Sequence, residues 1–371
     1  MKIKLSIFSA FLVSALALSA CAGNTSQTAA GSQSSEASSE AADKGAGSVS
    51  ESASKEDKSE VKQPQEPGAV PSDYKSITVR LGGLKGPTSL GMLKLLEDSK
   101  AGKLANTYDF TMSSNIEEVG PKLLSGELDI VAAPANMGAV LAKKSNDKVK
   151  MLAINTLGVL YIGAKGEDIK SVSDLKGKTI YASGKGGTPE YVLKYILSKN
   201  GLDPDKDVTI EWKSEHTEII STISNMDKAV AMCPEPFMTV AKTQIQGFDE
   251  VLDLTEEWDK VSEGRKLITA GLFARADFAE KNPEQIKRFL EEYKYSTEWV
   301  NANVAEAAKL SESYDIVKEP IALKAIPKCN ITYIDGREMA ELTKAYFDIL
   351  YSYNPQSVGG EVPGDEFFFT E

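Results

Sequence analysis

The feature that most constrains the fold is an alternation of short apolar segments with segments of helical periodicity, beginning near Ile77. Residues 76–82 alternate apolar and polar side chains with a period of two, as a half-buried strand does. Apolar runs at 128–133, 178–183 and 229–232 predict buried strands, and helical patterns separate them along the chain. Strands that alternate with helices predict an α/β fold with largely parallel sheets.

Four strand-to-helix junctions share one pattern, in which proline or glycine and a short polar residue introduce the helix. They are residues 86–89, 134–136, 186–189 and 234–236. Proline suits a first helical turn, and Ser, Thr and Asn are favoured N-caps. In a parallel sheet such junctions lie at the carboxyl ends of the strands, where ligands bind. Helix capping alone would explain any single junction, whereas four together favour a ligand site.

Glu235 and His216 are the two ionisable residues that stand out near these junctions. Glu235 follows an apolar strand and lies between two prolines at a helix start. Compensation of the helix dipole would explain this carboxylate, and so would hydrogen bonds accepted from a ligand. His216, the only histidine of the chain, follows the predicted strand 209–212. It either lines the same cleft or is an ordinary loop residue, and no His-rich metal site is expected.

The familiar catalytic and nucleotide-binding motifs are missing from the sequence. Residues 183–189 are glycine-rich but place Pro189 where a dinucleotide fingerprint requires glycine or alanine. Val172 stands where a P-loop requires its first glycine. No catalytic residue and no cofactor is therefore predicted. The formal net charge of -12 and the lack of a basic run argue against nucleic-acid binding. Cys233 and Cys329 are either two buried thiols or a disulfide, and the sequence leaves this open.

The N-terminus has the order of a secretory signal peptide over residues 1–20, with two lysines, an apolar stretch and small residues before Cys21. This arrangement resembles a bacterial lipobox, in which lipid is attached to the cysteine. The segment that follows, to residue 75, contains almost no large apolar side chain and predicts a disordered tether. The remaining chain of roughly 300 residues is long enough for two lobes.

Several short motifs, in their order along the chain, resemble the solute-binding proteins of ABC importers. They are residues 129–136, 171–178, 234–237 and 282–290. The nearest group handles nitrate, alkanesulfonates, taurine and thiamine-pyrimidine precursors. The resemblance implies the two-lobed periplasmic-binding-protein-like fold of type II, with a ligand cleft between lobes joined by two strand crossovers near 157–162 and 267–273. Lobe 1 would comprise residues 76–160 and 268–371, and lobe 2 residues 161–267.

The function that this resemblance implies is capture of a small polar solute by lobe closure. The protein would be extracytoplasmic, lipid-anchored to the bacterial cell membrane through Cys21, and monomeric. It would not be an enzyme, and it would serve an ABC permease and its ATPase subunit. The predicted ligand-binding residues are Lys85, Gly86, Pro87, Thr88, Ser89, Pro134, Asn136, Asn155, Gly186, Gly187, Thr188, His216 and Glu235.

The class of solute is less constrained. Lys85 and Lys185 could attract an anion such as a sulfonate, taurine or nitrate, but Glu235 would repel one. A nitrogen heterocycle such as a pyrimidine precursor is therefore preferred, with the anion as the alternative. The same fold resembles pyrimidine-precursor synthases, which use pyridoxal phosphate and a histidine; the tether and the single loop histidine argue against such an enzyme. A surface lipoprotein without a small ligand is a further alternative.

Overall fold

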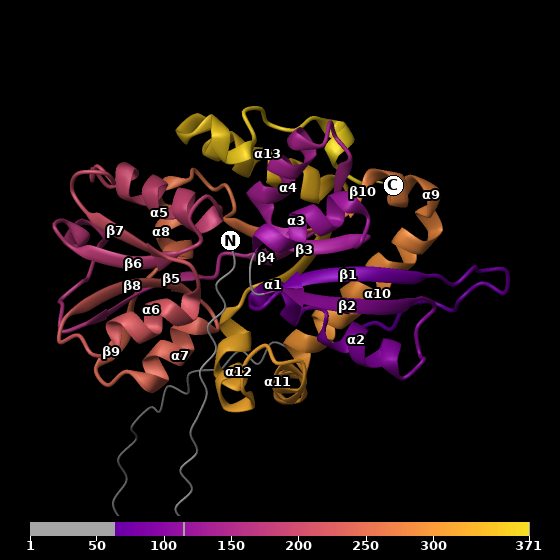
Figure 1. The fold of residues 1–371 in the computed structure, drawn as a ribbon, viewed down its shortest axis with the longest axis horizontal. Coiled ribbons are helices and arrows are strands. Elements are labelled where there is room, and N and C mark those ends of the chain that lie inside the picture. Colours follow the sequence, from indigo (N-terminus) through magenta and orange to yellow (C-terminus); the bar gives the residue numbers. More distant parts are fainter. Residues whose placement is uncertain (1–63, 114–115, 371) are drawn as a thin grey trace, which may run out of the picture. The chain divides into compact units, whose positions relative to one another are not determined.

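The computed structural model describes residues 64–113 and 116–370, which form two mixed β-sheets covered by helices (Figure 1). The predicted signal peptide, Cys21 and most of the predicted tether lie outside the described residues. Within the described part of the chain, no helix is both long enough and apolar enough to cross a membrane. The predicted α/β fold class is confirmed.

The first sheet has six strands in the order β11-β4-β10-β3-β1-β2. Its strands are β1 (Thr78–Leu84), β2 (Thr107–Ser113), β3 (Ile130–Pro134), β4 (Val149–Leu157), β10 (Ile268–Arg275) and β11 (Ile331–Asp335). Strand β1 runs parallel to β2 and β3, whereas β10 is antiparallel to both β3 and β4. Strand β11 is antiparallel to β4 at the edge of the sheet.

The second sheet has five strands in the order β7-β6-β8-β5-β9. Its strands are β5 (Leu160–Lys165), β6 (Thr179–Ser183), β7 (Thr209–Lys213), β8 (Ala229–Pro234) and β9 (Phe248–Asp253). Strand β6 is parallel to β7 and β8, and β5 is antiparallel to β8 and β9.

The prediction of largely parallel sheets is correct for three neighbouring strands of each sheet and wrong for the remaining pairings. The antiparallel strands β5 and β10 are those on which the chain enters a sheet after leaving the other one. Parallel neighbours require a crossover connection, and the pairs β1–β2 and β6–β7 are joined in this way through helices at 87–100 and 188–199, whereas β5 and β10 each follow a strand of the other sheet. The assignment of residues 76–160, 161–267 and 268–371 to two hinged lobes stays a prediction.

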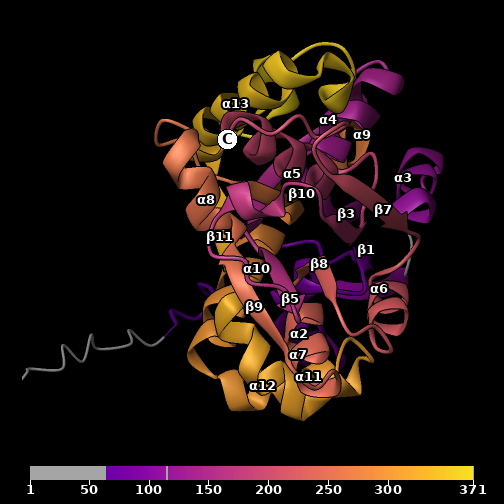
Figure 2. The same cartoon turned by 90° about the vertical axis from the view of Figure 1, so that its left-hand side faces the viewer.

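Helices lie on both faces of each sheet (Figures 1 and 2). Those around the second sheet are α5 (Thr188–Lys199), α6 (His216–Ile223), α7 (Phe237–Gln244) and α8 (Leu254–Val261). The others are α1 (Pro87–Leu90), α2 (Leu93–Lys100), α3 (Ile116–Ser125), α4 (Ala135–Lys144), α9 (Ala276–Lys281), α10 (Pro283–Ala302), α11 (Val304–Ser313), α12 (Glu319–Ala325) and α13 (Gly336–Tyr353). Four 3₁₀ turns complete the described elements: η1 (Val172–Leu175), η2 (Ile326–Lys328), η3 (Pro355–Val358) and η4 (Asp365–Phe367).

Close packing of α4 on the first sheet sets the position of the second predicted junction. The side chain of Phe273 on β10 lies so near the α4 backbone that a Cβ at Gly138 would meet its Cε1 atom at 2.0 Å. Only glycine permits this approach, since real side chains need more than 3 Å. Asn136, two residues earlier in α4, is thereby held at the carboxyl end of β3.

The last residues of the predicted tether are held against α10, which the low-complexity composition did not predict. Arg288 Nη1 donates to the Gly68 carbonyl oxygen at 2.7 Å, and Gln285 Nε2 donates to the Lys75 carbonyl oxygen at 2.9 Å. The Tyr74 hydroxyl donates to an acceptor on the body of the protein at 3.0 Å. Backbone carbonyls can be bound whatever the side chain is, so composition alone could not reveal these contacts.

Candidate functional site

The four predicted junctions lie where the sequence placed them, at the carboxyl ends of β1, β3, β6 and β8. Strands β1 and β3 run parallel in the first sheet, as β6 and β8 do in the second, so two junctions share an edge of each sheet. The N-cap positions are Gly86, Pro134, Gly187 and Pro236, and none of them makes a side-chain capping bond. The prediction that Ser, Thr or Asn caps these helices is therefore wrong. The short polar residues of the first three junctions lie inside the first helical turns instead.

Two of these first turns, one from each sheet, meet at Asn136. Its side chain is fully buried, and its Oδ1 accepts a hydrogen bond from Thr188 Oγ1 at 3.1 Å. Its Nδ2 donates to the Ser357 carbonyl oxygen at 3.0 Å and, more weakly, to the Gly186 carbonyl oxygen at 3.4 Å. The Thr188 hydroxyl also lies 3.4 Å from the Thr269 carbonyl oxygen. The structure thus brings together three predicted residues from α4, α5 and the loop before α5.

Three residues that the sequence did not suggest complete this group, which we call the Asn136 cluster: Asn136, Thr188, Thr269, Tyr346 and Ser357. Thr269 Oγ1 and Ser357 Oγ are buried and have no hydrogen-bond partner among the described residues. Burial raises the pKa of Tyr346, and the nearby Thr188 hydroxyl opposes this shift. The cluster therefore offers uncharged hydroxyl groups whose bonding capacity is not exhausted by the protein.

The junction after β1 is tied to the strand β4 rather than to the second sheet. Asn155 Nδ2 donates to the Thr88 carbonyl oxygen at 3.0 Å, and Ser89 Oγ donates to the Leu84 carbonyl oxygen at 2.7 Å. Thr88 Oγ1 is buried without a partner in the described residues. Tyr293 on α10 lies close to Asn155. Burial raises the pKa of Tyr293 to about 12, and Asn155 opposes that shift. Thr88 and Asn155 thus meet, as both were predicted to belong to the site.

The predicted positive charges are weaker candidates in the structure. Lys85 forms an ion pair of 3.0 Å with Asp315, whose side chain is 92% exposed. Lys185 is exposed in the loop before α5. Exposed ion pairs contribute little energy and are screened by salt. Lys85 is therefore partly neutralised on the surface, and the buried hydroxyls rather than the lysines characterise the site.

Glu235 is fully buried and is bound by its own helix. One carboxylate oxygen accepts from the Thr239 backbone N–H at 3.1 Å and the other from Thr239 Oγ1 at 2.9 Å. Burial raises the pKa of Glu235, and the two bonds from Thr239 oppose that shift. The structural explanation therefore accounts for one bond to each oxygen, while the ligand role of Glu235 stays a prediction.

The sequence left open whether Cys233 and Cys329 form a disulfide. In the structure both are free and buried thiols.

His216 begins α6, and its ring is held by two residues that the sequence did not single out. Its Nδ1 lies 2.5 Å from Ser183 Oγ at the end of β6. The ring of Phe237, the first residue of α7, lies against the imidazole with centroids 4.6 Å apart at 38°. Burial lowers the pKa of His216 to about 4. Elements that follow three neighbouring strands of the second sheet thus converge on a neutral imidazole.

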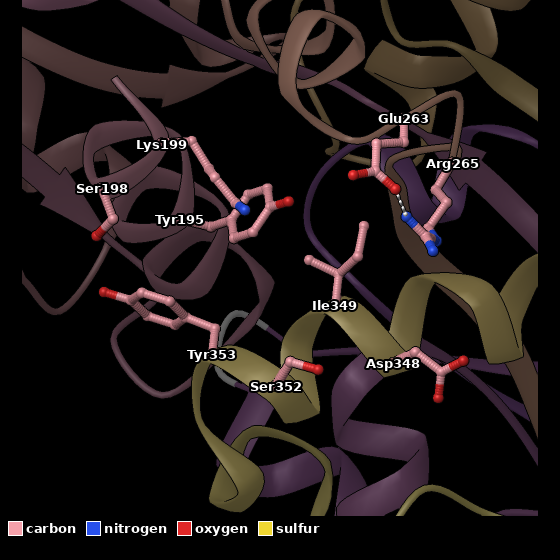
Figure 3. A pocket seen from close by; sticks show the side chains of 9 residues that line it. All are labelled: Tyr195, Ser198, Lys199, Glu263, Arg265, Asp348, Ile349, Ser352 and Tyr353. Carbon is pink, nitrogen blue, oxygen red and sulfur yellow. Dashed lines mark hydrogen bonds and ion pairs between the residues drawn. The ribbon is translucent and has the colours of Figure 1, made fainter. Parts of the chain in front are cut away.

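The structure also contains two pockets that lie away from the predicted residues. One, of about 370 Å³, is lined by α5, the loop after α8, and α13 (Figure 3). In it Arg265 pairs with Glu263 at 3.1 Å, and the Tyr195 hydroxyl donates to the Val261 carbonyl oxygen at 3.2 Å. The other, of about 490 Å³, surrounds ion pairs of Asp129 at the opposite ends of the strands β1 and β3. At the carboxyl end of β3, the side chain of Asn136 is in contact with the Gly186 carbonyl oxygen and the Thr188 hydroxyl.

No group of three or more His, Cys, Asp or Glu residues in ranges 64–113 and 116–370 is arranged to hold a metal ion. The site described above consists of hydroxyls, amides, one neutral imidazole and one buried carboxylate.

Comparison with known families identifies a match over most of the structured chain. The family described as ABC transporter, phosphonate, periplasmic substrate-binding protein matches residues 101–318. Curated relatives from Brucella abortus, named as binding proteins, are 24% identical over 170 residues. That alignment covers 46% of this chain and 51% of the relative, so the chain spans about half the length of the curated relatives it matches.

Solved structures share the fold over a longer stretch. An ABC transporter protein from Parabacteroides distasonis superposes with a TM-score of 0.67 at 20% identity, covering 79% of this chain and 99% of that one. The periplasmic aliphatic sulphonate binding protein of Escherichia coli gives 0.63 at 16% identity, with 79% and 92% covered. The periplasmic nitrate-binding protein of Synechocystis PCC 6803 gives 0.55 at 12% identity, with 79% and 91% covered. At these identities the likeness shows a common fold, as the sequence motifs implied.

Proposed function

We propose, since the chain belongs to the family of ABC-transporter periplasmic substrate-binding proteins for phosphonate, that it captures a small organic solute with an oxyanion head group. The solute would bind at the carboxyl ends of β1, β3, β6 and β8. Binding proteins of this family work outside the cytoplasm with a permease and an ATPase. This chain would deliver its solute to such a pair.

The Asn136 cluster is the observation that supports an oxyanion. Its hydroxyls and its amide are uncharged, and Thr269 Oγ1 and Ser357 Oγ have unused hydrogen-bonding capacity. Asn136 and Thr188 of the cluster lie in the first turns of α4 and α5, whose first N–H groups have no partner within the helix and carry partial positive charge. Hydroxyl and N–H donors of this kind stabilise a buried oxyanion without a lysine or arginine. The printed names of similar proteins concern phosphonate, sulphonate and nitrate, which all carry oxyanions.

The contacts of Glu235 reverse the preference that the sequence suggested. The argument for a nitrogen heterocycle assumed that the carboxylate oxygens of Glu235 are free to accept hydrogen bonds from a ligand. Both oxygens of Glu235 already accept hydrogen bonds from Thr239, and burial favours the uncharged acid. Burial thus disfavours the negative charge of Glu235, which weakens the main objection to an anionic solute.

A nitrogen heterocycle remains the second candidate, because of the aromatic pair at the start of α6 and α7. His216 and Phe237 lie ring against ring, with centroids 4.6 Å apart. A planar heterocycle could stack on such a pair, and its N–H groups could use the second lone pairs of Glu235. Under this alternative, binding would depend on Glu235 and Phe237 rather than on the hydroxyls of the Asn136 cluster.

Calorimetry with a defined panel of solutes tests the proposal. Methylphosphonate, 2-aminoethylphosphonate, ethanesulfonate and nitrate represent the oxyanions, and an aminopyrimidine represents the heterocycles. Thr269→Val, which removes a buried hydroxyl without a partner among the described residues, should weaken binding of the preferred oxyanion about tenfold to a hundredfold, because a hydrogen bond to a charged group contributes about 1.5–3 kcal/mol. Thr222→Val, which removes a hydroxyl that bonds only the Glu218 carbonyl oxygen on α6, is the matched control. Tight binding of the aminopyrimidine with no effect of Thr269→Val would contradict the proposal.

The remaining features of transport stay part of the proposal. Residues 76–160 with 268–371 would form one lobe and residues 161–267 the other, and the protein would act as a monomer. The two would close over the solute, because contacts to both sides shift the population towards the closed form. Lipid attachment at Cys21, outside the described residues, would keep the protein at the membrane. Small-angle scattering of the protein should show a smaller radius of gyration when the solute is added.

A further inference from the structure

We propose that Ser183 is a positioning residue, which holds His216 in the tautomer that carries its proton on Nε2. The imidazole then presents a fixed N–H donor to an acceptor atom of the solute. This second step rests on the proposed function, whereas the choice of tautomer does not. The inference gives Ser183 a role that neither its place at the end of β6 nor any motif in the sequence suggested.

The hydrogen bond between the two side chains permits only two arrangements of the proton. Ser183 Oγ and His216 Nδ1 lie 2.5 Å apart, so one of the two atoms donates to the other. Ser183 is 3% exposed, and within the described residues its hydroxyl forms no other hydrogen bond. If Nδ1 were the donor, the buried serine O–H would be left without an acceptor, which is unfavourable. The serine therefore donates to Nδ1, and the ring proton lies on Nε2.

The backbone fixes this pair in place. Strands β6 and β7 run parallel, and Ser183 is the register partner of Lys213, which precedes His216 by only a short loop. Phe237 covers the ring at a centroid distance of 4.6 Å and so opposes its rotation. Pairing of two strands and one aromatic contact thus determine which nitrogen meets the serine, and Nε2 is the nitrogen left for another partner.

The surroundings favour the neutral imidazole that a tautomer requires. Burial alone lowers the pKa of His216 to about 4, and no acidic side chain contributes to its shift. The two nearest acids in the sequence are engaged elsewhere: Glu215 accepts from the Thr217 hydroxyl at 3.4 Å and Glu218 from the Ser214 N–H at 3.0 Å. In the described chain no carboxylate therefore orients the ring as it would in a hydrolytic triad, so the Ser183–His216 pair is suited to recognition.

A fixed Nε2–H selects among solutes. An oxyanion or a carbonyl oxygen can accept from it, whereas a solute that presents an N–H group at the same place would set two donors against each other. A site built around one donor discriminates strongly, because the wrong solute leaves a buried polar group unpaired. Ser183 would thereby act on specificity without touching the solute.

The single histidine makes the tautomer directly measurable. In the full chain labelled with ¹⁵N-histidine, only one pair of imidazole nitrogens gives signals. At neutral pH and without solute, the wild type should show a non-protonated, hydrogen-bonded Nδ1 and a protonated Nε2. Ser183→Ala should reduce the ratio of the Nε2–H to the Nδ1–H form by about two- to tenfold, the effect of one ordinary hydrogen bond. Ser183→Thr, which keeps the hydroxyl, should restore the wild-type ratio.

A matched serine and one added solute complete the test. Ser221→Ala removes a hydroxyl that bonds the Thr217 carbonyl oxygen on the same helix as His216, and it should leave the ratio unchanged. Addition of methylphosphonate should shift the Nε2 signal of the wild type. A protonated Nδ1 in the wild type, or an unchanged ratio in Ser183→Ala, would overturn the inference. If methylphosphonate binds by calorimetry without moving the Nε2 signal, the donor role is wrong; if no oxyanion binds at all, the proposed function fails while the tautomer result stands.

Discussion

Replacing Asn136 with alanine should separate the two sheets more than any other single change at the site. Asn136 is fully buried and makes three hydrogen bonds, two of them to the segment that begins α5. The partners Gly186 and Thr188 belong to the second sheet's connections, while Asn136 itself follows β3 of the first sheet. The side chain therefore links the two halves of the site directly.

The magnitude follows from these bonds. An ordinary hydrogen bond contributes about 1 kcal/mol net, and the 3.4 Å bond to the Gly186 carbonyl oxygen contributes less. The Ser357 carbonyl oxygen would lose its donor, whereas the Thr188 hydroxyl keeps the Thr269 carbonyl oxygen as an alternative acceptor. Asn136→Ala should therefore lower the free energy of unfolding by about 2–3 kcal/mol. The bonds that join the sheets account for about 1–2 kcal/mol of this, which is about five- to thirtyfold in the equilibrium between closed and open forms.

Urea unfolding and small-angle scattering measure the two parts separately. Asn200→Ala is the matched control, because Asn200 Nδ2 donates only to the Ile196 carbonyl oxygen, 2.8 Å away at the end of α5. The control should lose about 1 kcal/mol and keep the wild-type radius of gyration. Asn136→Ala should lose more and should show a larger radius without solute. Equal losses in both variants, together with equal radii, would refute the view that Asn136 links the two sheets.

Four further predictions concern three other residues, Glu235, Tyr74 and Cys21. Glu235→Gln should leave the free energy of unfolding at pH 7 near the wild-type value, whereas Glu235→Ala should lower it by about 2–3 kcal/mol. The reason is that only alanine removes both acceptors of the bonds from α7. Equal losses in the two variants would contradict this. Burial raises the pKa of folded Glu235, so its stabilising effect is complete below the ordinary carboxyl pKa and is lost as the pH rises through the raised value; Glu235→Gln should remove that dependence in unfolding curves measured across this range. Tyr74→Ala should release the segment before β1, whose tyrosine hydroxyl bonds the body at 3.0 Å, and should speed limited proteolysis there, unlike the exposed Tyr351→Ala. Cys21→Ala should move the protein from the membrane to the soluble fraction of the cells, and equal partition of both forms would count against the lipid anchor.

The sequence alone determined the fold class, and it predicted the edge of each sheet at which the candidate site lies. Apolar periodicity reports which side chains face a core, so it located the strands that end at Pro134, Ser183 and Pro234. Proline and glycine after those strands then marked the helix starts, and the topology of α/β sheets placed them at the ligand-binding edge. These inferences need only local patterns, which is why they survived in the structure.

Local patterns failed where the backbone left the simplest arrangement. The strands β5 and β10 run antiparallel to their neighbours, and periodicity reports which side chains face a core but not the direction of a strand. Glycine and proline occupy the N-cap positions that Ser, Thr and Asn were expected to fill. The Ser, Thr and Asn residues of these junctions instead form hydrogen bonds with distant parts of the chain or with the preceding strand, which helix propensity does not predict.

Only the tertiary structure decided which polar groups meet. Thr188 and its two acceptors on Asn136 and Thr269 lie 52 and 81 positions apart in the sequence, and Asn136 is 221 positions from Ser357. Ser183 at the end of β6 and His216 at the start of α6, which are joined by one hydrogen bond, are 33 positions apart. A buried hydrogen bond depends on the distance and direction between two atoms, and these are set by how whole sheets and helices pack. The periodicity of the chain shows that such groups are buried, but it carries no record of the partner that each one meets.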